Sequence, residues 1–147
     1  MGEIYEKIKK FFDIAPEATT QISAVGPIDA NEADNIGEEA FAVSDKTGLP
    51  GRHNGQRDAF RHAYLSCRMA QELGTDQAEK IGNIHEEYGQ NPPEETVMDL
   101  NNNEVGRRLA VKGGESVDCK QSVWDALNKG ELQTAPTPGA VAPKLNY

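Results

Sequence analysis

The chain has 147 residues, 37% of them hydrophobic, and a net charge of -9 from 24 acidic and 15 basic side chains. A chain of this length is expected to form one domain that folds without help from a metal or a disulfide. The acidic excess repels phosphate, so no nucleic-acid partner is expected, and no apolar run reaches the roughly 18 residues of a transmembrane helix.

The N-terminal third is predicted to hold two helices. Apolar residues at helical spacing predict an amphipathic helix over residues 3–14 that packs on the core, with a partner-binding or membrane-surface helix as the alternative. Residues 17–29 show no clear pattern and are expected to be irregular. A second helix is expected to begin at Asp29 or Asn31, either of which can cap it, and to end near Ser44.

The middle of the chain carries the clearest helical pattern. Glycines and a proline predict a loop over residues 47–55. The helix predicted over residues 56–73 has one apolar face, and Gly74 is well placed to end it. Its inward stripe contains Phe60, Ala63, Tyr64, Cys67 and Gln71.

Three more helices are expected before the tail. The first runs from a cap at Thr75 or Asp76 to about residue 88, with Ile81, Ile84 and His85 in or near the core. The second covers residues 95–111 after a proline pair. Its candidate core positions are Val97, Leu100, Val105 and Leu109. The third is capped by Ser116 and stops at Gly130.

No strand alternation and no internal repeat occurs, so the expected fold class is all-α. We expect one compact domain of five or six short helices. Residues 1–48 would pack as a helical segment on a core at residues 49–130 that carries the functional site. Residues 131–147 are rich in proline and alanine and predict an extended tail.

The two cysteines, Cys67 and Cys119, leave two interpretations open. Free cysteine often behaves as a small core residue, so a pair of buried thiols is the favoured one. A disulfide is the alternative if the protein works in the periplasm or outside the cell. Their spacing gives no zinc-finger signal.

Residues that suit catalysis gather between His53 and Arg108. Asp58 and His62 are four residues apart and share one face of their helix. His85 and Glu86 follow on the next helix. The third group, on the helix after that, consists of Asp99, Asn101, Asn102, Asn103 and Arg107. Each group alone can be read as a surface pair, a core histidine or loop hydrogen bonding, but together they predict a site.

The series HNGQRDAFRHAYLS, HE and MDLNNNEVGRR resembles a bacterial domain family of unknown function. Its pattern is N-G-x-x-D-A-x-R-H-A, then H-E, then M-D-x-x-N-N-x-x-G-R, matched here over residues 53–110. Such domains occur alone and at the C-terminal ends of secreted polymorphic toxins and effector-like proteins. The resemblance marks Asn54, Asp58, Arg61, His62, His85, Glu86, Asp99, Asn102 and Arg107.

The first of two enzyme hypotheses is a lysozyme-like peptidoglycan glycosidase without a cofactor. Glu86 would be the general acid and Asp99 the base or electrostatic stabiliser. His62 and His85 complete the catalytic set. Side chains that bind the cell-wall polymer would be Asn54, Arg61, Asn102, Asn103 and Arg107.

The second enzyme hypothesis is a metal-dependent hydrolase of a phosphodiester, a phospholipid or a peptide. Asp58, His62, His85 and Asp99 would bind a divalent metal such as zinc, and Glu86 would be the general base. Arg61 weighs against this set because it adds positive charge beside the ligands.

A third hypothesis is a binding or adaptor module whose polar residues form a structural network. In any of the three, an immunity protein or the secretion machinery is a candidate partner. The N-terminus lacks the continuous apolar region of a signal peptide. We therefore expect a protein that is cytoplasmic before export and is secreted, or delivered to the periplasm, without a cleaved signal.

Overall fold

Helices form all the regular secondary structure in residues 16–147, which are the residues that the structure, a computed structural model, describes. The helix expected over residues 3–14 lies outside the described residues. A helical segment covers residues 16–25. The helices that follow are α2 (Pro27–Asp45), α3 (Gln56–Leu73), α4 (Thr75–Gly89), α5 (Pro93–Gly113) and α6 (Cys119–Asn128). The prediction of a single all-α domain is confirmed.

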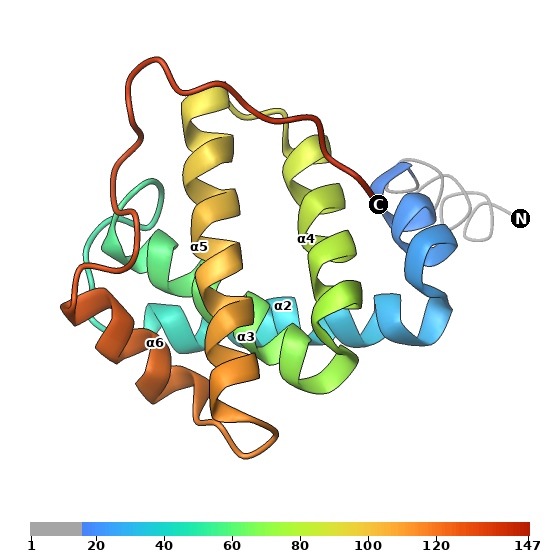
Figure 1. Ribbon diagram of the computed structural model, residues 1–147, viewed down its shortest axis with the longest axis horizontal. Helices are drawn as coiled ribbons and strands as arrows, with labels where there is room; N and C mark the ends of the chain where they lie inside the picture. The colour runs from blue at the N-terminus through green and yellow to red at the C-terminus, as the bar shows by residue number, and fades with distance from the viewer. Residues whose placement is uncertain (1–15) are drawn as a thin grey trace, which may run out of the picture.

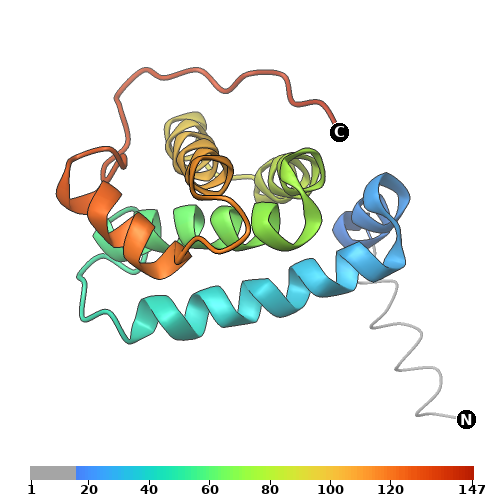
Figure 2. The same cartoon turned by 60° about the horizontal axis from the view of Figure 1, so that its bottom comes forward.

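The central helix is α3, which contacts α2, α4, α5 and α6. Helix α2 runs along one side of α3, whereas α4 and α5 lie side by side on the opposite side (Figures 1 and 2). The predicted apolar stripe of α3 is buried, with Phe60 and Cys67 fully covered. Trp124 from α6 packs against Phe60 in a T-shaped arrangement, at 6.2 Å between ring centroids. Helix α3 therefore packs against each of the helices α2, α4, α5 and α6.

The contact between α3 and α5 is close enough to exclude a side chain at one position. A Cβ atom added to Gly106 of α5 would lie 2.1 Å from the carbonyl oxygen of Ala63 on α3. Only glycine allows two backbones to approach this closely. The approach brings the face of α5 that contains Asp99 and Asn103 against α3, so this glycine positions the site described below.

Replacing Gly106 with alanine is therefore expected to lower the free energy of unfolding by about 3 kcal/mol, because the helices must separate to admit the methyl group. Gly37 in α2 provides the matched control, since an added Cβ there meets nothing within 4 Å. Alanine at Gly37 should leave stability unchanged or raise it by up to about 1 kcal/mol. Urea unfolding of both variants tests this, and equal midpoints for the two variants would refute the close-approach explanation.

The prediction that residues 17–29 are irregular is wrong. Residues 16–25 are helical, and α2 already begins at Pro27, whose fixed φ suits the first helical position. Its N-cap is Gly26, not Asp29 or Asn31. The earlier segment is held by tertiary contacts: the Thr20 hydroxyl lies 2.9 Å from that of Tyr88 on α4. Such contacts override the weak helical preference of this threonine-rich stretch.

The caps of the later helices also differ from prediction. Asp118, not Ser116, caps α6 and accepts a hydrogen bond from the Gln121 amide at 3.1 Å. The N-cap of α4 is Gly74, without a side-chain cap, where Thr75 or Asp76 was expected. Gly74 also ends α3 with φ at 89°, as its position predicted. These shifts leave the order of helices unchanged.

The most informative difference lies in α5, where the predicted apolar stripe is only partly buried. The fully covered face is instead polar. It contains Asp99, Asn102 and Asn103 beside Thr96, Met98, Gly106 and Ala110. Burying carboxyl and amide groups costs free energy unless they gain partners, so this face marks either a structural network or a functional site.

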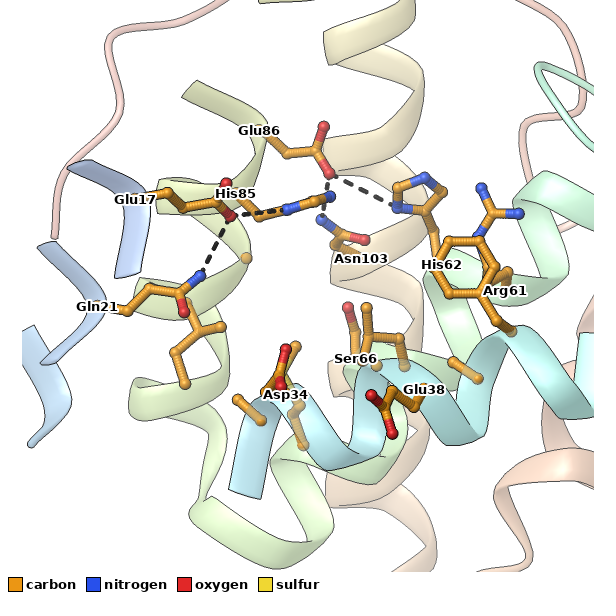
Figure 3. A pocket seen from close by; sticks show the side chains of 18 residues that line it. Glu17, Gln21, Asp34, Glu38, Arg61, His62, Ser66, His85, Glu86 and Asn103 are labelled. Carbon is orange, nitrogen blue, oxygen red and sulfur yellow. Dashed lines mark hydrogen bonds and ion pairs between the residues drawn. The ribbon is translucent and has the colours of Figure 1, made fainter. Parts of the chain in front are cut away.

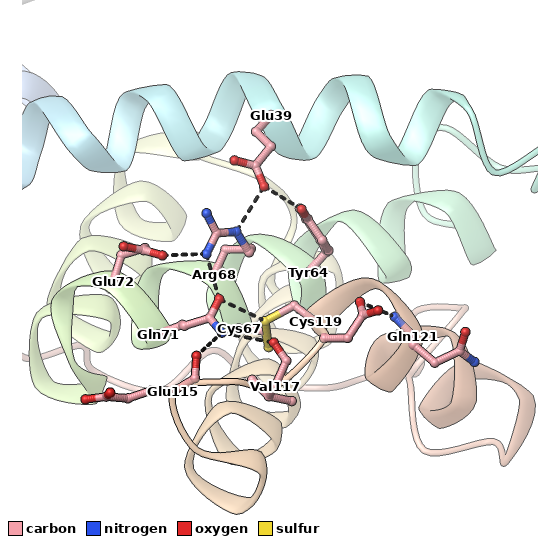
Figure 4. Close-up of a disulfide and its surroundings, with 11 residues drawn as sticks. Glu39, Tyr64, Cys67, Arg68, Gln71, Glu72, Glu115, Val117, Cys119 and Gln121 are labelled. Atoms are coloured by element: carbon pink, nitrogen blue, oxygen red, sulfur yellow. Dashed lines mark hydrogen bonds and ion pairs between the residues drawn. A yellow bond between two sulfur atoms is a disulfide. The ribbon is translucent and has the colours of Figure 1, made fainter.

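The two cysteines form a disulfide, so the favoured interpretation of two buried thiols is wrong (Figure 4). Cys67 on α3 and Cys119 at the start of α6 lie 5.9 Å apart at their Cα atoms. Gln71 supports the junction by donating to the carbonyl oxygens of Glu115 and Val117, both at 2.9 Å. The bond joins the two ends of a stretch that contains α4 and α5.

The predicted tail, residues 131–147, lacks helical structure and crosses the domain over α5 and α4, on their side away from α3 (Figure 2). Near its start, Gln133 is bound by Asn102. Near its end, the Asn146 carbonyl accepts a hydrogen bond from Asn83 of α4 at 3.1 Å. The tail is therefore attached to the helical core at both ends.

Candidate functional site

A cluster of ionisable side chains is buried where α3, α4 and α5 meet. His62 of α3 is its centre. One ring nitrogen, Nε2, lies 3.4 Å from a carboxylate oxygen of Asp58 and 3.4 Å from one of Asp99. The other, Nδ1, lies 3.5 Å from a carboxylate oxygen of Glu86. Three carboxyl groups from three helices thus surround one imidazole, and all four side chains are buried.

Helix geometry explains how the sequence produces this arrangement. Asp58 and His62 stack across one turn of α3, and the close approach at Gly106 brings Asp99 to them from α5. Glu86 extends from α4 toward the other edge of the ring. The pattern of apolar residues does not predict this inward orientation.

Asp58 is fixed by two further donors. The backbone amide of Asn54 donates to its Oδ2 at 2.8 Å, and the Arg61 guanidinium binds its Oδ1. Arg61 itself lies over the Phe41 ring, 4.5 Å from the centroid, and donates to the Arg52 carbonyl at 3.2 Å. A loop and two helices therefore hold Asp58 in one orientation.

The cluster carries more negative than permanent positive charge, with three carboxyl groups against one guanidinium. Burial, reinforced by the charges of Glu86 and Asp58, raises the pKa of Asp99 to about 7. Burial alone would lower the pKa of His62, but the Asp58 hydrogen bond and the charges of Asp99 and Glu86 outweigh it and raise that pKa. Protons on these two groups would offset the excess negative charge.

The pKa of Asp58 moves in the opposite direction. Burial would raise it, but hydrogen bonds from His62 and the Asn54 amide, with the positive charges of His62 and Arg61, lower it overall. Asp58 is therefore the cluster's firmly ionised carboxylate, while Asp99 titrates near neutrality. Two carboxyl groups beside the same imidazole nitrogen thus have different protonation behaviour, as acid and base pairs in enzymes do.

Three of the four predicted metal ligands converge. Asp58, His62 and Asp99 each offer one ligand atom, and these atoms lie within 4.8 Å of one another. The Asp99 Oδ1 is buried and has no hydrogen-bond partner among the described residues. The fourth predicted ligand, His85, is not in this group; its Nδ1 lies 2.9 Å from a carboxylate oxygen of Glu17, and the side chain is 55% exposed.

The predicted polymer-binding residues fall in several places. Asn103 of α5 joins the cluster, its amide nitrogen 3.4 Å from a Glu86 carboxylate oxygen. The Asn54 side chain binds Glu95. Burial lowers the pKa of Arg107, and the negative charges that oppose this shift are those of Glu79 and Glu104, not those of the cluster.

Asn102, which was predicted to bind a polymer, is fully buried and attaches the tail. Its Nδ2 donates to the Gln133 carbonyl and its Oδ1 accepts from the Gln133 amide, both at 2.8 Å. The neighbouring Asn101 side chain makes a third contact, with the Gln133 side chain at 2.8 Å. The side-chain amide of Asn102 thus uses both its nitrogen and its oxygen in a contact that the sequence does not reveal.

Asn102→Ala is expected to destabilise the protein by about 2 kcal/mol, because it leaves a backbone donor and acceptor of Gln133 without partners. Asn101→Ala, which removes one exposed contact between side chains, should change the unfolding free energy by less than about 0.5 kcal/mol. Limited proteolysis provides the second measurement, since only the Asn102 variant should release the tail early. Equal cleavage rates in the two variants would show that Asn102 does not hold the tail.

A cavity of about 370 Å³ adjoins the cluster between residues 16–25, α2, α3 and α4 (Figure 3). His62, Arg61, Glu86 and Asn103 line it, so it reaches the edge of the ionisable cluster. Sequence reasoning missed Glu17, Asp34 and Glu38, which also line it. The spacing of Asp34 and Glu38, one turn apart on α2, was the available signal.

These features define a small α-helical domain with a buried histidine–carboxylate site beside a cavity. The chain belongs to the family described as Domain of unknown function (DUF6973), whose model matches residues 20–133. This match contains every residue of the cluster and confirms membership of a domain family without an assigned activity. No solved structure matches the chain significantly. Among the described residues, no helix is both long and apolar enough to cross a membrane.

Proposed function

We propose that this protein is a metal-dependent hydrolase in which Asp58, His62 and Asp99 bind a divalent cation that activates water. The observation that carries the proposal is the convergence of ligand atoms from three buried residues. In addition, the buried Oδ1 atom of Asp99 has no hydrogen-bond partner among the described residues. Three protein ligands leave a coordination position open for water, as in catalytic zinc sites.

The contacts behind the ligands support the same proposal. A histidine that binds a metal through one nitrogen usually has its other nitrogen held by a carboxylate or carbonyl. Glu86 occupies that place at His62 Nδ1. Asp58 is also held in place, because the Asn54 amide binds its Oδ2 and the Arg61 guanidinium binds its Oδ1.

Charge supports a divalent cation as well. Asp58, Asp99 and Glu86 contribute three negative charges and Arg61 one positive charge. Two positive charges would make the cluster neutral with His62 in its neutral, metal-binding form. Arg61, which counted against a metal site on sequence grounds, therefore completes the balance.

The bound cation would lower the pKa of a coordinated water so that hydroxide is available near neutral pH. Asp58, His62 and Asp99 would hold it in place, and Glu86 would orient the imidazole. Arg61 borders both Asp58 and the cavity, so its guanidinium is placed to stabilise negative charge that develops on the substrate. Hydroxide would add to an acyl carbon of the substrate, and the bond to the leaving group would break as that group took up the proton lost by the water.

The disulfide supports a site of action outside the reducing cytoplasm, where such bonds persist. Together with the motif resemblance to effector and toxin domains, it supports a substrate in the bacterial cell envelope. We therefore propose an effector-like protein that is delivered to the periplasm or secreted and that cleaves a bond of the envelope.

One observation favours a glycosidase as a second candidate. With a pKa of about 7, Asp99 holds a proton near neutrality, and it faces Glu86 across the His62 ring. In this alternative the roles first assigned to the two residues would be exchanged, with Asp99 as general acid.

Incubation of the pure protein with peptidoglycan, with and without chelator and added zinc or manganese, distinguishes the candidates. The metal hydrolase should release new amino groups only with metal, and Asp58→Asn should abolish release. Reducing ends that appear despite chelator, and disappear in Glu86→Gln, would instead establish the glycosidase. A protein without activity under every condition, recovered from cells with a bound partner, would refute both enzymes in favour of a binding module.

A further inference from the structure

The cavity beside the cluster has the size and lining of a ligand pocket. Its volume of about 370 Å³ falls within the range of small-molecule sites. Phe41, Leu65 and Met69 contribute apolar wall. Figure 3 shows Asp34 and Glu38 on α2 at one side and Glu86 with Asn103 at the other. Because the cavity has both apolar and polar lining residues, a ligand with an aliphatic chain and a polar end fits it.

The lining is strongly acidic. Within residues 16–147 it contains four carboxylates, from Glu17, Asp34, Glu38 and Glu86, and one permanent cation, Arg61. Among the residues that the structure describes, Asp34 and Glu38 have neither a hydrogen-bond nor an ion-pair partner. An anionic ligand such as a phosphate ester would be repelled here, whereas a cation would be attracted.

Two basic side chains on the described part of the lining each have an acidic partner. Arg61 binds Asp58, and His85 binds Glu17. The cavity therefore has unused hydrogen-bond acceptors.

Asn103 adds an independent indication of what the cavity accepts. It is only 3% exposed, lines the cavity, and leaves its Oδ1 without a hydrogen-bond partner among the described residues. Its amide orientation follows from chemistry, because Glu86 is a carboxylate that contacts Nδ2 as an acceptor, which places Oδ1 on the other side. A buried acceptor without a partner costs free energy that a donor on a ligand would recover.

We propose that this cavity binds a primary ammonium group on an aliphatic stem, as a lysine-like side chain presents, and that the substrate of the hydrolase carries this group. The substrate class is then an amine-bearing peptide or amide rather than a phosphodiester or phospholipid. This assignment of substrate class rests on the proposed function, whereas ammonium binding does not. The stem packs on the apolar wall, and the ammonium donates to Asn103 Oδ1 and faces the carboxylates.

Calorimetric titration of chelator-treated, metal-free protein tests the pocket without requiring catalysis. The probes are Nα-acetyl-lysine amide and its neutral counterpart Nα-acetyl-norleucine amide, which keeps the stem and lacks the charge. The lysine compound should bind at least about tenfold more tightly. Equal affinity of the two probes would overturn the proposal. So would the absence of binding of the lysine compound at about 10 mM, because a specific small-molecule site is expected to have a lower dissociation constant than this.

Charge-neutralising variants locate the binding. Asp34→Asn combined with Glu38→Gln should weaken the lysine probe about tenfold without unfolding the protein, because both side chains are exposed. Asp29→Asn combined with Glu32→Gln is the matched control: it removes the same two charges from the same helix at positions that do not line the cavity. Equal losses in the double variant and the control would show general attraction to an acidic surface and contradict the pocket.

These outcomes are separable from those of the proposed function. Selective lysine binding by a protein that hydrolyses nothing with any metal would refute the hydrolase and retain the pocket. Metal-dependent hydrolysis by a protein that does not distinguish the two probes would support the hydrolase and refute the ammonium pocket.

Discussion

Removal of the disulfide by a Cys67→Ala, Cys119→Ala double substitution is expected to lower the free energy of unfolding by about 4 kcal/mol. The bond closes a stretch with a sequence separation of 52 residues, and the entropy that such a closure removes from the unfolded chain sets this magnitude. For a chain of this size the melting temperature should fall by roughly 8–16 °C.

Thermal unfolding with and without reductant checks this expectation. Reductant should lower the melting temperature of the wild-type protein toward that of the double variant and leave the variant unchanged. The stretch closed by the bond carries Glu86 and Asp99, so its loosening should also reduce metal binding. A wild-type protein that melts at the same temperature in both conditions would contradict the stabilising role.

A second large effect is expected from Asp99→Asn, and it should depend on pH. The folded-state pKa of Asp99 is raised to about 7, above its unfolded value. This carboxyl group therefore favours folding in its protonated form, and that contribution is lost as pH rises from about 4 through 7. The metal-free wild-type protein should thus become less stable over this interval, by an amount on the order of 4 kcal/mol.

The asparagine variant cannot ionise at this position, so it should escape that loss. It should equal the wild type within error at pH 4 and exceed its melting temperature by about 8 °C or more at pH 8, when both are free of metal. Asp34→Asn, at an exposed carboxylate, is the control and should show no such dependence. A difference between variant and wild type that stays constant from pH 4 to 8 would contradict the assigned pKa.

Much of the fold is predictable from the sequence, because the spacing of apolar residues and the glycines at helix ends determine local structure. The α3 stripe of Phe60, Ala63 and Cys67 is buried as its period indicates, and Gly74 ends the helix. The helix at residues 16–25 escapes prediction, since its position depends on contacts with α4 that are remote in sequence.

The site is only partly predictable, for a related reason. Asp58 and His62 are found by their spacing on one helix, and the motif resemblance marks Glu86 and Asp99. Apolar periodicity places Asp99 off the core face of α5, because such a pattern does not anticipate carboxyl groups buried against partners from other helices. The roles of His85 and Asn102 depend on Glu17 and Gln133, whose proximity only the folded chain creates.

Disulfide pairing shows the same limit. Two cysteines on separate predicted helices are compatible with buried thiols or with a bond, and the choice depends on the distance between α3 and α6. The observed Cα separation of 5.9 Å lies within the range of natural disulfides.

The central claim is that Asp58, His62 and Asp99 bind a divalent cation, and equilibrium dialysis followed by elemental analysis tests it most directly. Protein stripped with chelator and dialysed at pH 7.5 against micromolar zinc or manganese should retain about one ion per chain. Asp99→Asn should retain less than about one tenth of an ion, whereas His85→Ala, outside the ligand group, should retain as much as wild type. A wild-type protein that retains neither metal, or an Asp99→Asn variant that retains as much as the wild type, would contradict the claim.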